Sequence, residues 1–220
     1  MSKIDLNTTA LQALLAKAEA LPDASAGYEE GQQAAYDAFW DSFQDEGARF
    51  NYNHGFYNWT EDCFRPKYPL ATKWGGSATY MLAYSLVEDT KVDITFGSGT
   101  NALQTFYSAT KLHTIHKLIV LAATTYDKTF HNCPALVNLT VEGVIGQNGF
   151  DLQNSTVLSK ASIESVVSAL SQDTSGLSIT FSLAAVNTAF ETASGTADGS
   201  TSEAWLNLIA TRSNWTISLV

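Results

Sequence analysis

The stretch that decides the fold is Lys128–Gly143, with the sequence KTFHNCPALVNLTVEG. An aromatic residue, Phe130, is followed by a turn-forming Asn-Cys-Pro and then by apolar residues at Leu136, Leu139 and Val141. The same opening occurs earlier in the chain, where Thr105-Phe106 is followed by Leu112 and Ile115. An aromatic, a turn and a short strand placed this close together indicate one unit of a repeated structure.

The repeat begins near Tyr80, and its apolar anchors are Leu82, Phe106 and Phe130, which are equally spaced in the sequence. Each anchor precedes a short β-rich segment; the three segments are 92–96, 118–121 and 139–141. One such unit cannot bury its apolar face alone, but stacked units can bury one another. We therefore expect a short solenoid with parallel strands, in which the aromatic side chain fills the interior. Lys117 stands where Val141 would put an apolar residue, which indicates a slip of one residue at the start of that strand.

After Gly146 the pattern changes to alternating helices and strands. Ser159 is a candidate N-cap for a helix whose apolar face is Ile163, Val166, Val167 and Leu170. Residues 177–181 and 215–219 alternate as strands, a short helix with Leu183, Val186 and Phe190 lies between them, and Ser200–Glu203 has the spacing of a capping box before a helix over 204–210. This order predicts parallel strands and a βα cap at the C-terminal end of the solenoid.

The N-terminal part has a different pattern. A helix is expected over 8–20, with Leu11, Leu14 and Leu15 on one face, and a second helical face carries Tyr36, Phe39, Trp40 and Phe43. The first face needs a partner, either the rest of the chain or further copies of it, and is a candidate for oligomerisation. The aromatic face is interpreted as core, and the alternative is a docking face. The expected organisation is a helical anchoring unit over 1–49, an aromatic-rich capping segment over 50–79, and a leucine-rich-repeat-like domain over 80–220. The expected fold class is α/β.

Composition excludes some functions. The formal net charge is -10, and no run of Lys and Arg is present, so nucleic-acid binding is not expected. The N-terminus does not have the basic start and apolar core of a signal peptide, and no segment is long and apolar enough to predict a membrane span. We therefore expect synthesis in a cytoplasm, without membrane insertion. The two cysteines, Cys63 and Cys133, fit neither a disulfide scaffold nor a metal pattern and are expected to be reduced.

No pattern in the sequence predicts catalysis, a cofactor or a metal. His113 and His116 have H-x-x-H spacing, but no further ligand completes a zinc pattern, so these residues and His131 are interpreted as surface residues of the repeats. The chain is therefore not expected to be an enzyme. Residues 50–68 hold many aromatics among Asn and Gly; they are interpreted as a lid, and the alternative is a ligand site for surface glycans with contacts at Tyr52, His54, Tyr57 and Trp59.

The run from Phe130 to Val141, Phe-x-Asn-Cys-x-x-Leu-x-x-Leu-x-Val, resembles BspA-type leucine-rich repeats of bacterial surface proteins. Residues 138–170 and the tail 196–220 resemble the C-terminal block of leucine-rich-repeat proteins from gut Firmicutes and their phages. The segments 27–47 and 64–68 are similar to the stretch before the repeats in the phage-borne proteins. The chain departs from them in being short, with about three recognisable repeats, which puts an extended receptor face in doubt.

This resemblance implies a virion structural protein of the tail, baseplate or fibre, with a repeat domain for protein–protein or host-surface attachment. Its partners would be other virion proteins, further copies of the chain, and a host surface glycan or protein. Its location would be the virion. The alternative is a free or cell-surface bacterial leucine-rich-repeat adhesin or carbohydrate-binding module, against which the missing signal-peptide pattern counts.

Overall fold

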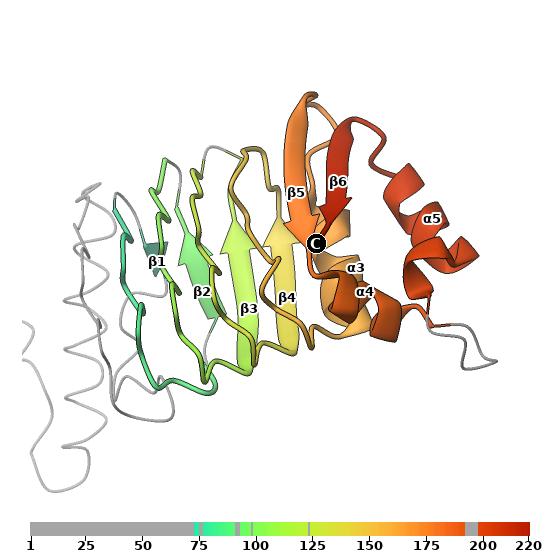
Figure 1. Ribbon diagram of the computed structural model, residues 1–220. Helices are drawn as coiled ribbons and strands as arrows, with labels where there is room; N and C mark the ends of the chain where they lie inside the picture. Colours follow the sequence, from blue (N-terminus) through green and yellow to red (C-terminus); the bar gives the residue numbers. More distant parts are fainter. Residues whose placement is uncertain (1–72, 75–76, 91–92, 98, 123, 192–197) are drawn as a thin grey trace, which may run out of the picture. The chain divides into compact units, whose positions relative to one another are not determined.

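The structure, a computed structural model, describes residues 73–74, 77–90, 93–97, 99–122, 124–191 and 198–220 (Figure 1). The chain divides into two compact units, and all of the described residues belong to the same unit, which includes Thr72–Val220. The described part is mixed α/β: it contains a four-stranded sheet and a two-stranded sheet, and the strands pair in parallel in both. The predicted α/β class and parallel strands are therefore confirmed.

The strands of the first sheet follow one another in chain order, and in the described part helices appear only after the fourth strand. The first sheet consists of β1 (Lys73–Trp74), β2 (Asp93–Phe96), β3 (Thr114–Val120) and β4 (Asn138–Gly143). The later elements are α3 (Lys160–Ala169), β5 (Leu177–Phe181), α4 (Leu183–Ala189), the 3-10 helix η1 (Gly199–Thr201), α5 (Glu203–Ala210) and β6 (Trp215–Leu219).

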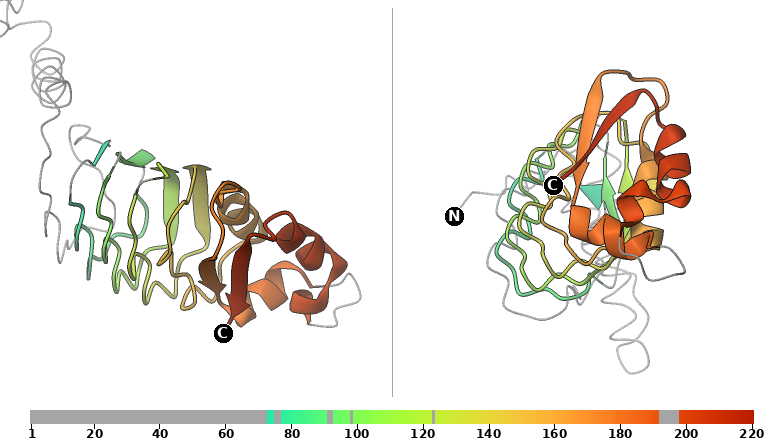
Figure 2. Two further views of the ribbon diagram at one scale, coloured as in Figure 1. Left: turned by 90° about the horizontal axis from the view of Figure 1, so that it is seen from above. Right: turned by 45° about the vertical axis from the view of Figure 1, so that its right-hand side comes forward.

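Successive layers of the chain are joined by backbone hydrogen bonds at a nearly constant interval in sequence. Strand β3 pairs with β4 with Thr114 opposite Asn138, an offset of 24 residues. Away from the sheet, alternate N–H groups donate to the next layer over 2.8 to 3.1 Å; the donors are Ala78, Tyr80, Leu82 and Tyr84 in one layer and Ala102, Gln104, Phe106 and Ser108 in the next. Figure 2 shows these layers side by side. This interlayer ladder gives hydrogen-bond partners to backbone groups that would otherwise be buried without one.

The core lies between the sheet and this ladder. Phe106 and Phe130 are fully buried, and their rings stack with centroids 5.1 Å apart. Phe150 continues the column, 5.0 Å from Phe130. The expected interior role of Phe106 and Phe130 is therefore confirmed. The residue before each of these two phenylalanines is a buried threonine whose hydroxyl bonds the preceding layer. Thr105 Oγ1 donates to the Ala78 carbonyl over 3.0 Å, and Thr129 Oγ1 donates to the Ala102 carbonyl over 2.8 Å.

A left-handed backbone conformation recurs in successive layers. Its members are six non-glycine residues with φ between 53° and 59°. They form two series with the repeat interval, which from Ser108 to Asn132 is 24 residues: Tyr80, Gln104 and Lys128, then Tyr84, Ser108 and Asn132. L-residues avoid this region because Cβ approaches the following carbonyl oxygen. The recurrence therefore shows that the layers share a backbone path as well as an interval.

The four-stranded sheet ends at a helix. At the outer edge of β4, the Ser162 hydroxyl of α3 accepts from the Leu139 N–H over 2.8 Å and donates to the Val137 carbonyl over 2.9 Å. One turn later, the Ser165 hydroxyl accepts from the Val141 N–H over 2.8 Å and donates to the Val141 carbonyl over 3.2 Å. Helix α3 thus supplies to β4 the partners that a fifth strand would supply, which protects an edge that could otherwise pair with another chain.

The C-terminal region forms its own sheet. Strands β5 and β6 pair in parallel, as predicted, with Ile179 opposite Ile217. However, β5 does not extend the first sheet, because α3 already occupies the edge of β4. An isolated parallel bridge between Leu152 and Phe181 connects β5 to the segment that follows β4.

The predicted caps of α3 and α5 have different outcomes. Ser159 caps α3 as expected, because its side chain accepts from the Ser162 N–H. The capping box from Ser200 to Glu203 is wrong: the N-cap of α5 is Ser202, whose hydroxyl accepts from the Trp205 N–H over 3.2 Å. Ser200 lies within the 3-10 helix η1, and its hydroxyl donates to the Asp198 carboxylate instead.

Candidate functional site

The solvent-facing side of the four-stranded sheet carries polar side chains that alternate with core residues. In β2, Ile94 and Phe96 point inward, while Asp93 and Thr95 lie on the outer face. On β4, Asn138, Thr140 and Glu142 are exposed between buried Leu139 and Val141. This alternation follows the two-residue period of a strand. We call the outer side chains of β2, β3 and β4 the sheet face.

An irregularity in β3 places two neighbouring side chains on the sheet face. Ile115 pairs with Leu139 but Leu118 pairs with Val141, so His116 and Lys117 together stand opposite one residue of β4. This is the arrangement of a β-bulge, which redirects side chains and increases the local twist. The slip expected from Lys117 is thus confirmed, but it lies within the strand and not at its start.

The bulge builds a small charged network across three strands. His116 Nδ1 lies 2.7 Å from Asp93 Oδ1, and Lys117 Nζ lies 3.3 Å from Glu142 Oε2 and 3.7 Å from Asp93 Oδ2. The hydrogen bond to Glu142, followed by the charges of Asp93 and Glu142, raises the pKa of the Lys117 ammonium. Because all four side chains are at least one-third exposed, these contacts contribute little to the stability of the fold.

A second surface feature is a column of rings on the ladder side of the layers. Tyr84 and Tyr107 lie with ring centroids 5.6 Å apart, and Tyr107 stacks on His131 at 5.1 Å. His131 Nδ1 lies 3.4 Å from Asp151 Oδ2 at the end of the column. Tyr107 and His131 stack face to face, whereas the Tyr84 ring is tilted by 56° against Tyr107. These ring contacts join successive layers to one another.

The three histidines named in the sequence have separate partners. His113 Nδ1 lies 3.0 Å from Thr114 Oγ1, His116 faces Asp93, and His131 belongs to the ring column. Within the described ranges, no group of three or more His, Cys, Asp or Glu side chains could hold a metal ion. Cys133 is buried as a free thiol, as expected.

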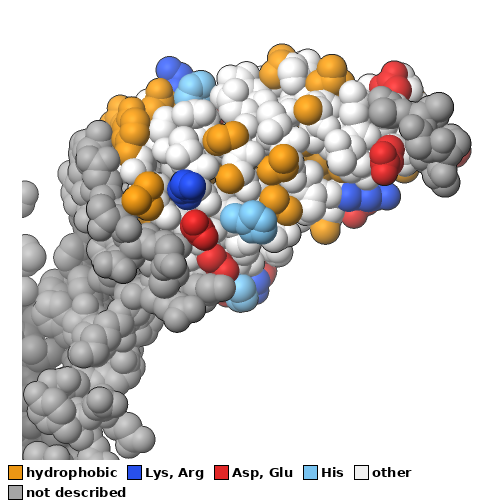
Figure 3. All heavy atoms as spheres, turned by 60° about the horizontal axis from the view of Figure 1, so that its bottom comes forward, with side chains coloured by type: hydrophobic (Ala, Val, Ile, Leu, Met, Phe, Trp, Pro, Cys, Tyr) orange, Lys and Arg blue, Asp and Glu red, His pale blue; other side chains and the backbone are white. Residues whose placement is uncertain are grey.

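The surface side chains outside the sheet are mostly uncharged. Figure 3 shows one face of the described part, on which scattered charged and apolar side chains stand among a larger area of other side chains and backbone. Such a surface offers hydrogen-bond donors and acceptors more than long-range attraction.

The site residues expected from the sequence lie outside the described residues. This applies to the glycan contacts, Tyr52, His54, Tyr57 and Trp59, and to the two helical faces, Leu11, Leu14, Leu15, Tyr36, Phe39, Trp40 and Phe43. The network of Asp93, Lys117 and Glu142 was not expected. The sequence did contain an indication of this network, because Asp93 and Lys117 carry opposite charges and are separated by the repeat interval.

Comparisons with known proteins find no matching family model, no matching curated protein and no matching solved structure. No helix in the described part has the length and apolar character needed to cross a bilayer.

Proposed function

We propose that residues 80–220 form a short leucine-rich-repeat-like solenoid with a βα cap. The supporting observation is that three features recur at nearly the same interval in the sequence: the strand register, the interlayer ladder and the left-handed residues. In a solenoid, each layer contacts only its neighbours, and its strands present one continuous face to partners.

The role we propose is structural attachment in a phage virion, as a component of the tail, baseplate or fibre. Two resemblances support the virion location. Residues 138–170 and 196–220 resemble leucine-rich-repeat proteins from gut Firmicutes and their phages, and residues 27–47 and 64–68 resemble the stretch before the repeats in the phage-borne proteins. The repeat domain docks on another virion protein or on the host surface, and further copies of the chain are expected partners. The proposal includes no catalytic step.

The sheet face is the docking surface in this proposal. Its side chains come from three successive strands, so their spacing is fixed by the backbone. Lys117 stands between two carboxylates at its centre, an arrangement that a partner can recognise by complementary charge. Docking against this network would be sensitive to the loss of one charge, because the remaining carboxylates would be left unpaired.

The first experiment asks whether the protein is part of a particle. We expect an antibody against the full chain to label gradient-purified phage particles from a host culture, and mass spectrometry of those particles to find its peptides. If the protein is instead found at the bacterial surface and is missing from particles, the virion assignment is overturned and the adhesin alternative gains support.

A second experiment tests the sheet face. Lys117→Gln should reduce incorporation into particles or adsorption to host cells, whereas Lys111→Gln, a change at an exposed lysine outside the strands, should not. Equal behaviour of the two variants would remove the sheet face as the docking surface.

A further inference from the structure

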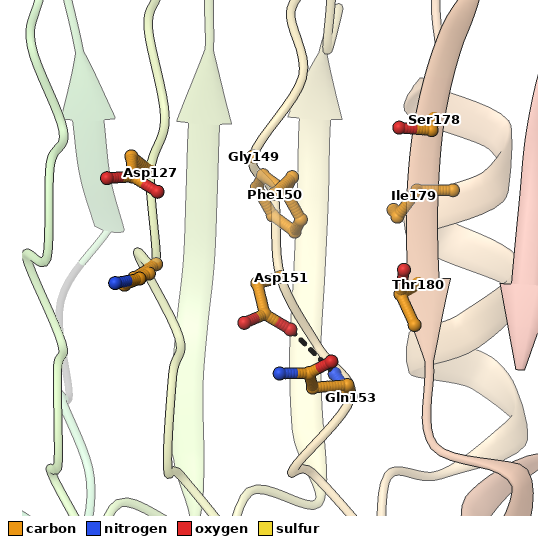
Figure 4. Close-up of a pocket in the computed structure, with 9 residues that line it drawn as sticks. Asp127, Gly149, Phe150, Asp151, Gln153, Ser178, Ile179 and Thr180 are labelled. Carbon is orange, nitrogen blue, oxygen red and sulfur yellow. Dashed lines mark hydrogen bonds between the residues drawn. The ribbon is translucent and has the colours of Figure 1, made fainter. Parts of the chain in front are cut away.

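A polar cavity of about 290 Å³ lies beyond the last complete layer of the ladder (Figure 4). Its walls come from three segments: the turn at Asp127 and Lys128, the extended segment Gly149–Gln153, and strand β5 at Ser178, Ile179 and Thr180. All of these residues are described, and the cavity is separate from the sheet face.

The cavity exists because the interlayer ladder stops there. In the preceding layers, the N–H of the left-handed residue donates onward: Tyr80 to the Leu103 carbonyl over 3.1 Å and Gln104 to the Asp127 carbonyl over 2.9 Å. Lys128 is the next residue of this series, but its N–H makes no hydrogen bond to a described residue. The segment that would accept it has turned towards β5, where the Leu152 N–H donates to the Thr180 carbonyl over 3.2 Å.

The chemistry of the walls is mixed. The Lys128 N–H, the Lys128 ammonium and the Thr180 hydroxyl are donors, and the Asp127 carboxylate is an acceptor; in the described part, no hydrogen bond or ion pair engages any of the four. Asp151 is held in place, because it accepts from the Gln153 N–H over 3.0 Å and lies 3.4 Å from His131. Gly149 allows the close approach: a Cβ at this position would overlap the Tyr126 carbonyl oxygen.

This combination selects a class of ligand. Two carboxylates disfavour a phosphate or another anion, and the Lys128 ammonium disfavours a bare metal ion, which also needs six or more oxygen ligands if it is Ca²⁺. A hydroxyl group both donates and accepts, so a hydroxyl-rich ring matches walls that carry both functions. The volume is at the lower limit of small-molecule sites and suits a single ring.

We propose that this cavity binds one sugar unit of a surface glycan, with Asp127 and Asp151 accepting from its hydroxyls and with the Lys128 N–H and Thr180 donating to it. The assignment of a surface glycan as the source rests on the attachment role proposed above; the binding of the sugar does not.

The test is a ¹H–¹⁵N NMR titration of the full chain with the methyl glycosides of glucose, galactose, mannose, rhamnose and N-acetylglucosamine. We expect at least one sugar to produce saturable shifts centred on the amides of Lys128, Gly149 and Asp151. Asp127→Ala and Thr180→Val should each weaken its binding by between about threefold and tenfold, the effect of losing one hydrogen bond. Asp173→Asn, at an exposed residue outside the cavity, is the matched control and should bind as the unaltered chain does.

Three results would overturn the site: no saturable shift with any of the sugars, shifts centred on the sheet face, or a response to Ca²⁺ or inorganic phosphate alone with none to sugar. Preserved spectra of the two cavity variants in the absence of sugar show that they fold. Sugar binding in the cavity together with absence from particles would reject the attachment role and retain the site. The reverse pair of results would reject the site alone.

Discussion

At the scale of the residue, the backbone conformations of the layers are more informative than their side chains. Lys128 has φ of 53°, and it occupies the same position in its layer as Gln104 and Tyr80. Three different side chains therefore adopt one unfavourable conformation, because the hydrogen bonds and packing of the layers determine the backbone path there. The cost of left-handed backbone for an L-residue is about 1–2 kcal/mol.

This cost predicts that Lys128→Gly stabilises the protein. Relief of about 1–2 kcal/mol exceeds the roughly 0.5–1 kcal/mol that glycine loses by its greater freedom in the unfolded chain. The gain in the free energy of unfolding should therefore be up to about 1.5 kcal/mol. Lys111→Gly is the matched control, since Lys111 is also exposed but is not among the residues with positive φ, and it should lose about 0.5–1 kcal/mol. Urea unfolding at constant m-value measures both; a loss of stability in both variants would contradict the argument.

Cys133 gives a prediction about reactivity and pH. Burial raises the pKa of its thiol to about 12, from an ordinary value of 9.0. In a Cys63→Ser background, we expect a thiol reagent at pH 8 to react with Cys133 only as fast as the protein opens, whereas in guanidinium the reaction should be immediate. Rapid labelling of the native protein would show that the site is accessible.

The raised pKa of Cys133 also predicts how the stability of the protein changes with pH. The unfolded thiol ionises near pH 9 while the folded thiol keeps its proton, so the unfolded state binds fewer protons and stability falls as pH rises from 9 towards 12. Cys133→Ala should reduce this fall. Alanine is a compatible replacement, because Ala109 occupies the equivalent buried position one layer earlier. A fall of equal size in both proteins would assign it to other groups, such as Tyr126, whose pKa burial also raises.

Apolar anchors could be predicted from single residues, but buried polar roles could not. Phe106 and Phe130 are large and periodic, so their burial followed from spacing alone. Thr105 and Thr129 recur at the same interval, yet a threonine in a Thr-rich chain gives no sign that its hydroxyl reaches a carbonyl of the preceding layer. That contact depends on how two layers stack, which is a tertiary property.

At the scale of the element, α3 explains why the first sheet ends. Ser162 and Ser165 are one turn apart on the same side of the helix, so both hydroxyls reach the edge of β4. The sequence indicated the helix and its apolar face correctly, but it gave no indication that these two serines bind the edge of a strand.

Removing these hydroxyls should expose the edge of β4. Ser162→Ala leaves the N–H of Leu139, a buried residue, without its partner and should cost about 1–3 kcal/mol, measured by chemical unfolding. Ser168→Ala is the control on the same helix: its hydroxyl makes no hydrogen bond to a described residue, and alanine has the better helix propensity, so stability should be unchanged or slightly higher.

The double variant Ser162→Ala/Ser165→Ala tests the protective role separately. With both partners removed, the edge of β4 can pair with another strand, so we expect self-association at rising concentration in sedimentation velocity. A double variant that loses stability but stays as monomeric as the Ser168→Ala protein would show that the serines satisfy the backbone without guarding the edge.

Element types were predictable from periodicity, but exact ends and caps depended on local geometry. Strand β3 begins at Thr114, earlier than its apolar run suggested, because the bulge lets polar His116 and Lys117 sit inside the strand. The cap of α5 is Ser202 because η1 intervenes, and the spacing from Ser200 to Glu203 gave no indication of that turn.

At the scale of the whole molecule, the repeat interval predicted which residues lie side by side, and it fails where the layers change. The parallel strands and their order followed from this interval, whereas the separate β5–β6 sheet did not, because nothing in the alternation of Leu177–Phe181 shows which strand it joins. The cavity lies at the same transition, where the segment 149–153 leaves the ladder. The sequence therefore predicted the arrangement of the repeated segments, but it did not predict the polar cavity at the point where the repeats end.

If the proposed solenoid is correct, a whole layer can be removed without destroying the fold. Deleting residues 106–129 joins Thr105 directly to Phe130, which restores the Thr-Phe pair of both layers. Strand β2 then becomes the neighbour of β4. Ile94 is separated from Val141 by as many residues as Leu118 is in the unaltered chain, so these two inward-facing residues can pair. We expect this variant to unfold cooperatively, at a lower denaturant midpoint because one layer and its interfaces are lost. Deleting residues 106–117 instead removes half a layer, so the residues of strand β3 fall where the ladder segment should continue, and the protein should not fold. Circular dichroism and urea unfolding compare the two. Equal loss of structure in both would mean that the layers are not interchangeable units, and the solenoid, with the attachment role built on its continuous face, would have to be abandoned.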